Sequence, residues 1–221
     1  MHGPNQLRIL IADDHAVTRV GLRNLLSRRP GWTVCAEAAT GREAVALAEQ
    51  HRPDIAVMDI AMPELNGLEA TRRIRKLFPR TEVLVLSLHY SDELVREVVD
   101  AGARAYVLKS DASKDLLRAI KSIANHQAYF TSPASEVLIK GFRGQNREAN
   151  SSVSIPKTLS SREREIVQLL AEGKSSKEVA VGLGISVKTA ETHRSNILRK
   201  LGMHSVTELV RFAVKHNMIE P

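Results

Sequence analysis

The sequence has few of the features that mark secreted or membrane proteins. It contains one cysteine, Cys35, so no disulfide can form within the chain, as is typical of proteins in reducing compartments. No apolar run approaches the length of about 20 residues that a transmembrane helix needs. The first residues, Met1–Gln6, include neither the basic segment nor the apolar segment of a secretory signal. We therefore expect a cytoplasmic protein with no membrane partner.

Composition and charge are those of a soluble protein. The chain has 221 residues, of which 43% are hydrophobic and 26% charged. At about 150 residues a domain, this length predicts one or two domains. The net charge is +7, and residues 158–221 hold ten Lys and Arg against seven Asp and Glu. This mild basic excess is compatible with nucleic-acid binding, although a solvated charged surface explains it equally well.

Residues 7–124 alternate short apolar runs with stretches of helical spacing. The predicted strands are Leu7–Ala12, Thr33–Ala38, Ile55–Asp59, Val83–Ser87 and Ala105–Leu108. The predicted helices that follow them are Val17–Arg28, Arg42–Gln50, Leu68–Leu77, Glu93–Ala101 and Lys114–Ala124. Strict alternation of strands and helices predicts a parallel sheet with helices on both faces. We therefore expect residues 1–125 to form a doubly wound α/β domain with a five-stranded parallel sheet.

The rest of the chain changes character twice. Residues 126–157 contain Gly, Asn and Ser and little apolar pattern, which predicts a linker with a short helix at Ser135–Phe142. Residues 158–221 are predicted to be a small all-α domain of four helices. Three helices should begin with a capping box, at Ser160/Glu163, Ser175/Glu178 and Ser205/Glu208. Ser186 is the N-cap predicted for the other helix, and helix ends are expected at Gly173, Gly184 and Gly202.

Polar residues stand at the ends of four predicted strands. They are Asp13 and Asp14 after the first strand, Asp59 and Ser87 at the ends of the third and fourth, and Lys109 after the fifth. In a doubly wound sheet these ends share one edge, where such sheets bind ligands. Clustered carboxylates resist joint ionisation, and Mg²⁺ relieves their repulsion. Asp59 is then a candidate nucleophile that forms an aspartyl phosphate, with Lys109 and Ser87 placed for phosphoryl oxygens. Each residue alone has a simpler interpretation as a turn, a cap or a solvated charge.

These motifs resemble the receiver domains of response regulators in bacterial two-component systems. They are Asp13-Asp14, Met58-Asp59-Ile60-Ala61-Met62-Pro63 with Gly67, Leu86-Ser87, and Tyr106-Val107-Leu108-Lys109. The resemblance implies a flavodoxin-like receiver whose Asp59 accepts a phosphoryl group from a sensor histidine kinase. It implies Mg²⁺ bound by Asp14, Asp59 and the Ala61 carbonyl, with Asp13 acting through water. It also implies that Tyr106 turns inward when Ser87 is drawn toward the phosphoryl group. The only reactions expected are self-phosphorylation and dephosphorylation of Asp59.

The third predicted helix of the C-terminal domain, Val187–Leu201, has two unlike faces. One face is apolar, with Ala190, Ile197, Leu198 and Leu201. The opposite face carries Lys188, Thr192, Ser195 and Arg199, with Glu191 beside them. This polar face suits a DNA major groove, because a Glu can accept from cytosine N4 and cations can contact phosphates. An ordinary amphipathic helix with a solvated face is the alternative.

The C-terminal domain also resembles the helix-turn-helix of the NarL/FixJ/LuxR type. The matching segments are Leu159–Val167, Glu178–Ala180, Leu183–His193 and Asn196–Leu201. The resemblance implies that Glu191, Thr192 and Ser195 face bases of a double-stranded DNA operator. It implies that phosphates are held by Lys188, Thr189, Arg194 and Arg199. The whole chain then resembles a transcription factor whose phosphorylation changes homodimerisation and operator binding.

Two other functions fit parts of the pattern. An enzyme with an aspartate nucleophile, such as a phosphatase, is disfavoured because Ala61 stands two residues after Asp59, where a second acid is expected. A DNA-binding protein with an unresponsive receiver is disfavoured by the complete set of five polar residues. Whether the receiver covers the DNA-binding helix is left open by the sequence.

Overall fold

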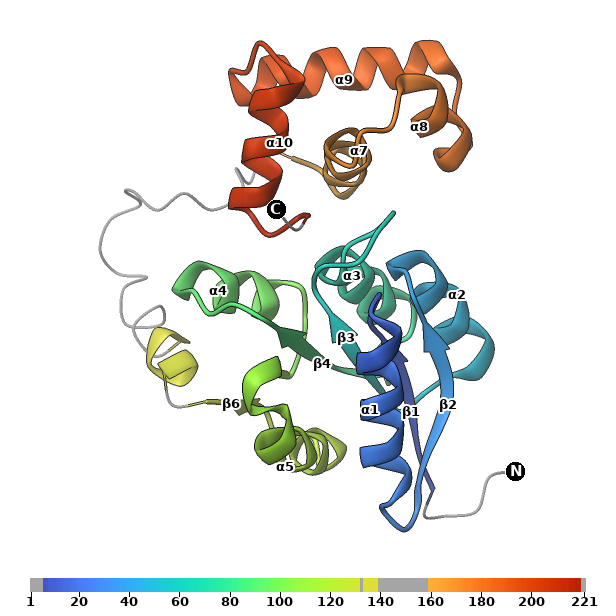
Figure 1. Cartoon of the computed structure of the whole chain (residues 1–221), viewed down its shortest axis with the longest axis vertical. Coiled ribbons are helices and arrows are strands. Elements are labelled where there is room, and N and C mark those ends of the chain that lie inside the picture. The colour runs from blue at the N-terminus through green and yellow to red at the C-terminus, as the bar shows by residue number, and fades with distance from the viewer. Residues whose placement is uncertain (1–5, 132, 139–158, 220–221) are drawn as a thin grey trace.

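The α/β part of the chain is built on a six-stranded parallel sheet (Figure 1). The computed structural model describes residues 6–131, 133–138 and 159–219. The strands are β1 (Leu7–Ala12), β2 (Trp32–Ala38), β3 (Ile55–Asp59), β4 (Glu82–Ser87), β5 (Ala105–Leu108) and β6 (Tyr129–Phe130). Their order is β2-β1-β3-β4-β5-β6, and all pairs are parallel. The doubly wound parallel fold is therefore confirmed.

The predicted number of five strands is wrong by one. The sixth strand, β6, pairs with β5 and contains only Tyr129 and Phe130. Two residues are too few to show the alternation that identifies a strand in a sequence, and β6 lies inside the segment that we predicted to be a linker. Residues 133–138 after it are helical. The remainder of the helix predicted to reach Phe142 lies outside the described residues.

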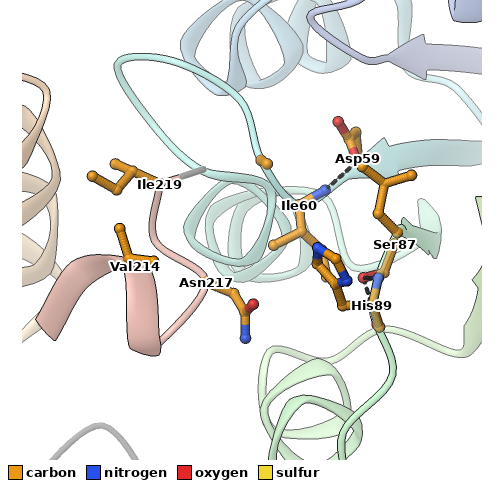
Figure 2. A pocket seen from close by; sticks show the side chains of 9 residues that line it. Asp59, Ile60, Ser87, His89, Val214, Asn217 and Ile219 are labelled. Carbon is orange, nitrogen blue, oxygen red and sulfur yellow. Dashed lines mark hydrogen bonds between the residues drawn. The ribbon is translucent and has the colours of Figure 1, made fainter. Parts of the chain in front are cut away.

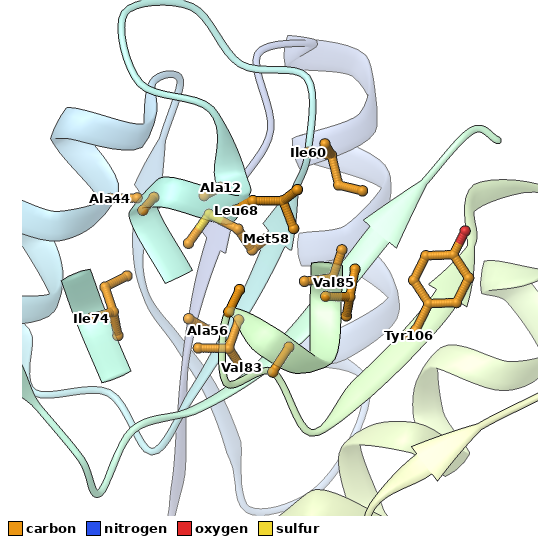
Figure 3. Packing of buried hydrophobic residues seen from close by; sticks show 14 of the residues in the cluster. Ala12, Ala44, Ala56, Met58, Ile60, Leu68, Ile74, Val83, Val85 and Tyr106 are labelled. Carbon is orange, nitrogen blue, oxygen red and sulfur yellow. The ribbon is translucent and has the colours of Figure 1, made fainter. Parts of the chain in front are cut away.

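Helices cover both faces of the sheet. They are α1 (Ala16–Ser27), α2 (Gly41–His51), α3 (Gly67–Leu77), α4 (Asp92–Asp100) and α5 (Ala112–Ala124), the last preceded by a 3-10 turn at Lys109–Asp111. Successive strand residues point to opposite faces, so each strand contributes side chains to two hydrophobic cores. Leu10 and Met58 pack in the cluster that includes residues of α2, α3 and α4 (Figure 3). Ile11 and Val57 pack in the cluster that includes residues of α1 and α5.

Four helices form the helical part of the chain, residues 159–219. They are α7 (Ser161–Ala171), α8 (Ser176–Leu183), α9 (Val187–Leu201) and α10 (Val206–Lys215). The capping boxes at Ser160 and Ser175 are complete, as predicted. At Ser205 only half of the predicted box forms, because the Glu208 carboxylate accepts from the backbone N–H of His204 instead. Left-handed glycines end α8 and α9, at Gly184 and Gly202.

The two parts of the chain contact each other in a definite arrangement. The helix α7 and the segment after α10 face the α/β part, whereas α9 lies farther from it (Figure 1). This places the segment after α10 next to the carboxyl ends of β3 and β4. Among the described residues, no helix is both long enough and apolar enough to cross a bilayer.

Candidate functional site

The five polar residues predicted to converge do meet at one edge of the sheet. The Lys109 Nζ lies 2.8 Å from Asp13 Oδ2 and 2.9 Å from Asp59 Oδ2. Both of these carboxylates are buried, whereas Asp14 is partly exposed at the rim. The backbone N–H of Ile60 donates to the other Asp59 oxygen, at 2.9 Å. Asp59 is thereby fixed with one oxygen toward Lys109.

Burial controls the protonation of this cluster. It raises the pKa of Asp59 to about 7, against the attraction of Lys109 and with the help of the negative charges of Asp13 and Asp14. Burial alone would lower the pKa of Lys109, but its contacts with Asp13 and Asp59 outweigh burial and raise that pKa. Lys109 is therefore a fixed cation, and Asp59 is a carboxyl group that changes charge near neutral pH.

The acidic cluster has the donor set of a hard cation. Asp13, Asp14, His15 and Asp59 each offer one ligand atom, and these atoms lie within 4.8 Å of one another. Oxygen ligands from carboxylates are those that Mg²⁺ and Ca²⁺ take. Neither Asp13 Oδ2 nor Asp59 Oδ2 has a hydrogen-bond partner with good geometry among the described residues. Two buried oxygens that meet only an ammonium group fit a site that also takes a cation.

Ser87, His89 and Tyr106 form a second hydrogen-bonded group beside Asp59. Ser87 Oγ donates to the carbonyl of His89 at 2.8 Å, and the Tyr106 hydroxyl donates to the same carbonyl at 2.6 Å. Tyr106 is fully buried, and burial raises its pKa to about 12, so it remains a donor. Tyr106 lies inside the protein in this structure, and the His89 carbonyl links its hydroxyl to that of Ser87.

A cavity of about 250 Å³ opens beside Asp59 and is closed on one side by the last turn of α10 and the segment after it. Asp59, Ala61, Ser87 and His89 line it from the α/β part (Figure 2). Its opposite wall consists of Val214, Asn217 and Ile219, which follow or end α10. We did not predict these three residues as part of the site. In the sequence, apolar residues at the end of a helix look the same whether they pack in the core of their own domain or contact another part of the chain.

The loop that follows Asp59 is bound by α7 of the helical part. Gln168 accepts from the backbone N–H of Asn66 at 2.7 Å and donates to the carbonyl of Met62 at 2.8 Å. Glu172 accepts from the backbone N–H of Glu64 at 3.1 Å. Three backbone groups between β3 and α3 are thus held by one helix. Any movement of this loop must strain or break these bonds.

Buried ion pairs strengthen the same contact. Glu165 of α7 is fully buried and accepts from Arg42 at 2.6 Å and from Arg73 at 2.7 Å, both from the α/β part. Arg164 of α7 also contacts Glu69 of α3. Removing the partners of a buried carboxylate destabilises the folded protein far more than removing those of an exposed one. The contact between α7 and the α/β part therefore depends on complementary charges as well as on complementary shape.

The predicted DNA-contacting face of α9 is exposed. The side chains of six of the seven predicted residues are open to solvent, and these are Lys188, Thr189, Glu191, Thr192, Ser195 and Arg199. Arg194 is half-buried, as expected from its place nearer the apolar face, and Ala190 and Ile197 are in the core of the helical part. The contacts with the α/β part come from α7 and from the segment after α10. The α9 face is consequently accessible in this arrangement.

Two family models match the chain, and together they cover most of it. One, the response regulator receiver domain, matches residues 9–121, and the other, the luxR family of bacterial regulatory proteins, matches residues 157–213. The oxygen regulatory protein NreC of Staphylococcus epidermidis (strain RP62A) is 37% identical over 217 residues, covering 97% of this chain and 100% of that protein. NreC of Staphylococcus aureus (strain MRSA252) is 38% identical over 216 residues, with the same shares of the two chains: 97% and 100%.

Solved structures agree with these matches. A two-component response regulator of the LuxR family from Aurantimonas sp. has 35% identity and a TM-score of 0.58, covering 62% of this chain and 99% of its own. RcsB of Salmonella enterica serovar Typhimurium, bound to the rprA promoter with the phosphomimetic BeF3-, has 25% identity and a TM-score of 0.61. That match covers 94% of this chain and 98% of RcsB. This chain therefore belongs to the DNA-binding two-component response regulators of the NarL/FixJ type, with a receiver followed by a LuxR-type helix-turn-helix.

Proposed function

We propose that Asp59 is the phosphoacceptor of this regulator and that a sensor histidine kinase is the donor. The observation that carries the proposal is the buried Asp59 carboxylate, 2.9 Å from Lys109 at the mouth of a cavity beside Ser87. An Asp59 oxygen attacks phosphorus, and the bond to the donor atom breaks as the acyl phosphate forms. Lys109 offsets the charge of the phosphoryl oxygens, and Ser87 donates a hydrogen bond to one of them. We propose no further enzymatic activity.

Mg²⁺ is the cofactor that we propose for this step. Asp14, Asp59 and the Ala61 carbonyl would hold it, with Asp13 acting through water. When bound, Mg²⁺ neutralises the carboxylates and the phosphoryl oxygens. The fit rests on the donor set, which consists of carboxylates within 4.8 Å of one another, and on Ala61, which lines the cavity next to Asp59.

Phosphorylation can be tested directly by mass spectrometry. The protein is treated with acetyl phosphate and Mg²⁺, and the mass of one phosphoryl group is sought on the parent and on Asp59→Asn. We expect the added mass on the parent alone, with the variant folded to the same extent by circular dichroism. Equal labelling of the variant would reject Asp59 as the acceptor.

We further propose that the exposed face of α9 reads operator DNA in the major groove. Glu191, Thr192 and Ser195 would face bases, and Lys188, Thr189, Arg194 and Arg199 would mostly contact phosphates. The accessibility of this face and the RcsB complex with the rprA promoter support the assignment. Selection of bound DNA from a random pool, with and without acetyl phosphate, would yield the operator and its dependence on phosphorylation.

Two copies of the chain are proposed to bind one operator. A single short module has few base contacts, and two linked modules gain affinity by effective concentration. On α10, Leu209 and Ala213 are buried in their own core, whereas Val206 and Val210 are only half-buried and are candidates for a dimer contact. We divide the chain into a receiver at 1–125, a connecting segment at 126–157 whose strand β6 is part of the receiver sheet, and a DNA-binding domain at 158–221. A cytoplasmic location follows from its proposed partners, a kinase and DNA.

A further inference from the structure

A second cluster of ligand-type side chains lies where the two parts of the chain meet. Glu93 and Glu97 stand one turn apart on α4 of the receiver, and His216 follows α10 of the helical part. One ligand atom from each of these residues lies within 4.8 Å of the other two. The closest approach described is 3.9 Å, between His216 Nδ1 and Glu93 Oε1. None of these residues belongs to the Asp59 site.

One nitrogen of the His216 imidazole, Nδ1, is buried without a hydrogen bond among the described residues. His216 is 3% exposed, and its Nδ1 atom has no hydrogen-bond partner within the described part of the chain. Glu93 Oε1 is likewise buried without one. One side of the ring is occupied by Phe212, whose centroid is 4.3 Å away. Buried polar atoms are nearly always hydrogen-bonded, so an unpartnered nitrogen that faces two carboxylates points to a missing ligand.

We propose that Glu93, Glu97 and His216 bind one divalent transition-metal ion of the zinc class. One imidazole nitrogen and two carboxylate oxygens are a donor set that Zn²⁺ takes, with water as a fourth ligand. Zn²⁺ ligands lie about 2.0–2.2 Å from the ion, so ligand atoms around it are about 3.3–3.6 Å apart. The separation of 3.9 Å between His216 and Glu93 therefore needs to close by only a few tenths of an ångström. The other pairs, which lie within 4.8 Å, need to close by up to about 1.5 Å.

A bound ion would bridge the two parts of the chain, because two of its ligands belong to α4 and the third follows α10. The site would tie α4 to the end of α10, next to Val214 and Asn217 in the wall of the Asp59 cavity. Bound metal would therefore stabilise the docked arrangement of the two parts. The binding itself does not depend on the function proposed above.

Zinc affinity of the full-length protein tests the proposal. It is measured against a chelating indicator, and the visible absorption of the Co²⁺ form reports on the ligands. We expect one tight site in the parent, which His216→Ala weakens by at least about tenfold, since loss of even an outer-shell partner often costs 10–100-fold. His204→Ala, which removes an exposed histidine of the same part of the chain, should leave the affinity unchanged. Any zinc held near Asp13, Asp14 and His15 is common to all variants and cancels in the comparison.

A second variant keeps the test decisive if His216→Ala does not fold. Glu93 is partly exposed on α4, so Glu93→Gln should fold, which circular dichroism can verify. It should weaken zinc binding and abolish the rise in melting temperature that zinc gives the parent. The proposal is overturned if these variants match the parent in zinc affinity and Co²⁺ absorption. It is equally overturned if the parent binds no zinc beyond that common to the variants, in which case His216 is a buried base paired with Glu93.

Discussion

At the scale of single residues, the site depends on one carboxyl group whose charge is balanced near neutral pH. Asp59 is buried beside Asp13 and Lys109, and its pKa is raised to about 7. Its neutral form is therefore favoured in the folded protein below that pH. Both metal binding and attack on phosphorus need the ionised form. The state of this one proton should consequently be visible in the chemistry of the site.

We expect the Mg²⁺ affinity of the protein to rise with pH up to about 7 and then to level off. Below this value a proton occupies Asp59 and competes with the cation, so the affinity should fall by up to tenfold for each pH unit, as for any single competing proton. Titration of Mg²⁺ between about pH 5.5 and 8.5 would measure it. Asp59→Asn should bind more weakly and lose most of this dependence. A flat profile for the parent would contradict the raised pKa.

At the scale of elements, the position of α3 fixes the backbone of Asp59. The helix begins at Gly67, whose N–H donates to the carbonyl of Ile60 at 2.8 Å. A Cβ at Gly67 would lie 1.8 Å from the carbonyl oxygen of Asp59. Such a contact with backbone cannot be relieved by a side-chain rotation. The close approach of α3 to the end of β3 therefore requires glycine.

Gly67→Ala should destabilise the protein and disturb phosphorylation together. We expect a loss of about 1–3 kcal/mol in the free energy of unfolding, typical of overpacking, and slower labelling by acetyl phosphate. Gly21→Ala is the matched control, because a Cβ there meets nothing within 4 Å. Gly21 lies inside α1, so this control variant should gain about 0.5–1 kcal/mol in the free energy of unfolding. Denaturant unfolding measures the stability of both variants. Equal stabilities would show that the backbone near Asp59 can move to accommodate the added Cβ.

The polar face of α9 gives a paired prediction about DNA. Glu191→Ala should relax the preference for one base pair by about 1–3 kcal/mol, since it would remove a base contact. Lys188→Ala should instead weaken binding to all sequences and reduce its salt dependence, because it would remove a phosphate contact. Affinities for the selected operator and for single-base changes, at several salt concentrations, distinguish the two effects. If both variants behave alike, the assignment of the face is wrong.

Most elements could be predicted because their signals are local. The runs Ile55–Met58 and Val83–Leu86 are apolar throughout, and Ser160 with Glu163 specifies a helix start without help from the rest of the chain. The convergence of Asp13, Asp59 and Lys109 follows from the geometry of a parallel sheet. The strand β6 was missed because its two residues pair only through a tertiary contact. The interface residues Gln168 and Ile219 were missed for the same reason.

At the scale of the whole molecule, the loop that follows Asp59 and the helical part of the chain are in direct contact. Gln168 holds two backbone groups of the loop after Asp59, and Glu165 is buried between Arg42 and Arg73. The α9 face is accessible, so docking does not cover it. Docking does fix the orientation of the helical part and places Val214 and Ile219 at the Asp59 cavity. Phosphorylation in that cavity is therefore expected to weaken docking and free the helical parts to pair on DNA.

Removal of Gln168 should reproduce part of this release. Gln168→Ala loses two hydrogen bonds across the contact, worth about 1 kcal/mol each. We expect several-fold tighter operator binding by the unphosphorylated protein. Gln50→Ala, an exposed glutamine at the end of α2, is the control and should bind as the parent does. Weaker or unchanged binding by Gln168→Ala would mean that docking does not restrain DNA binding.

The central claim is that phosphorylation of Asp59 sets the population of DNA-competent dimers. It is tested most directly by measuring the operator affinity and the oligomeric state of the full-length protein, with and without phosphorylation, at one fixed salt concentration, because affinity depends on salt. The account predicts that the phosphorylated protein binds as a dimer and at least about tenfold more tightly, a gain expected from effective concentration, whereas Asp59→Asn does not respond. The same affinity and the same oligomeric state in both forms would contradict it.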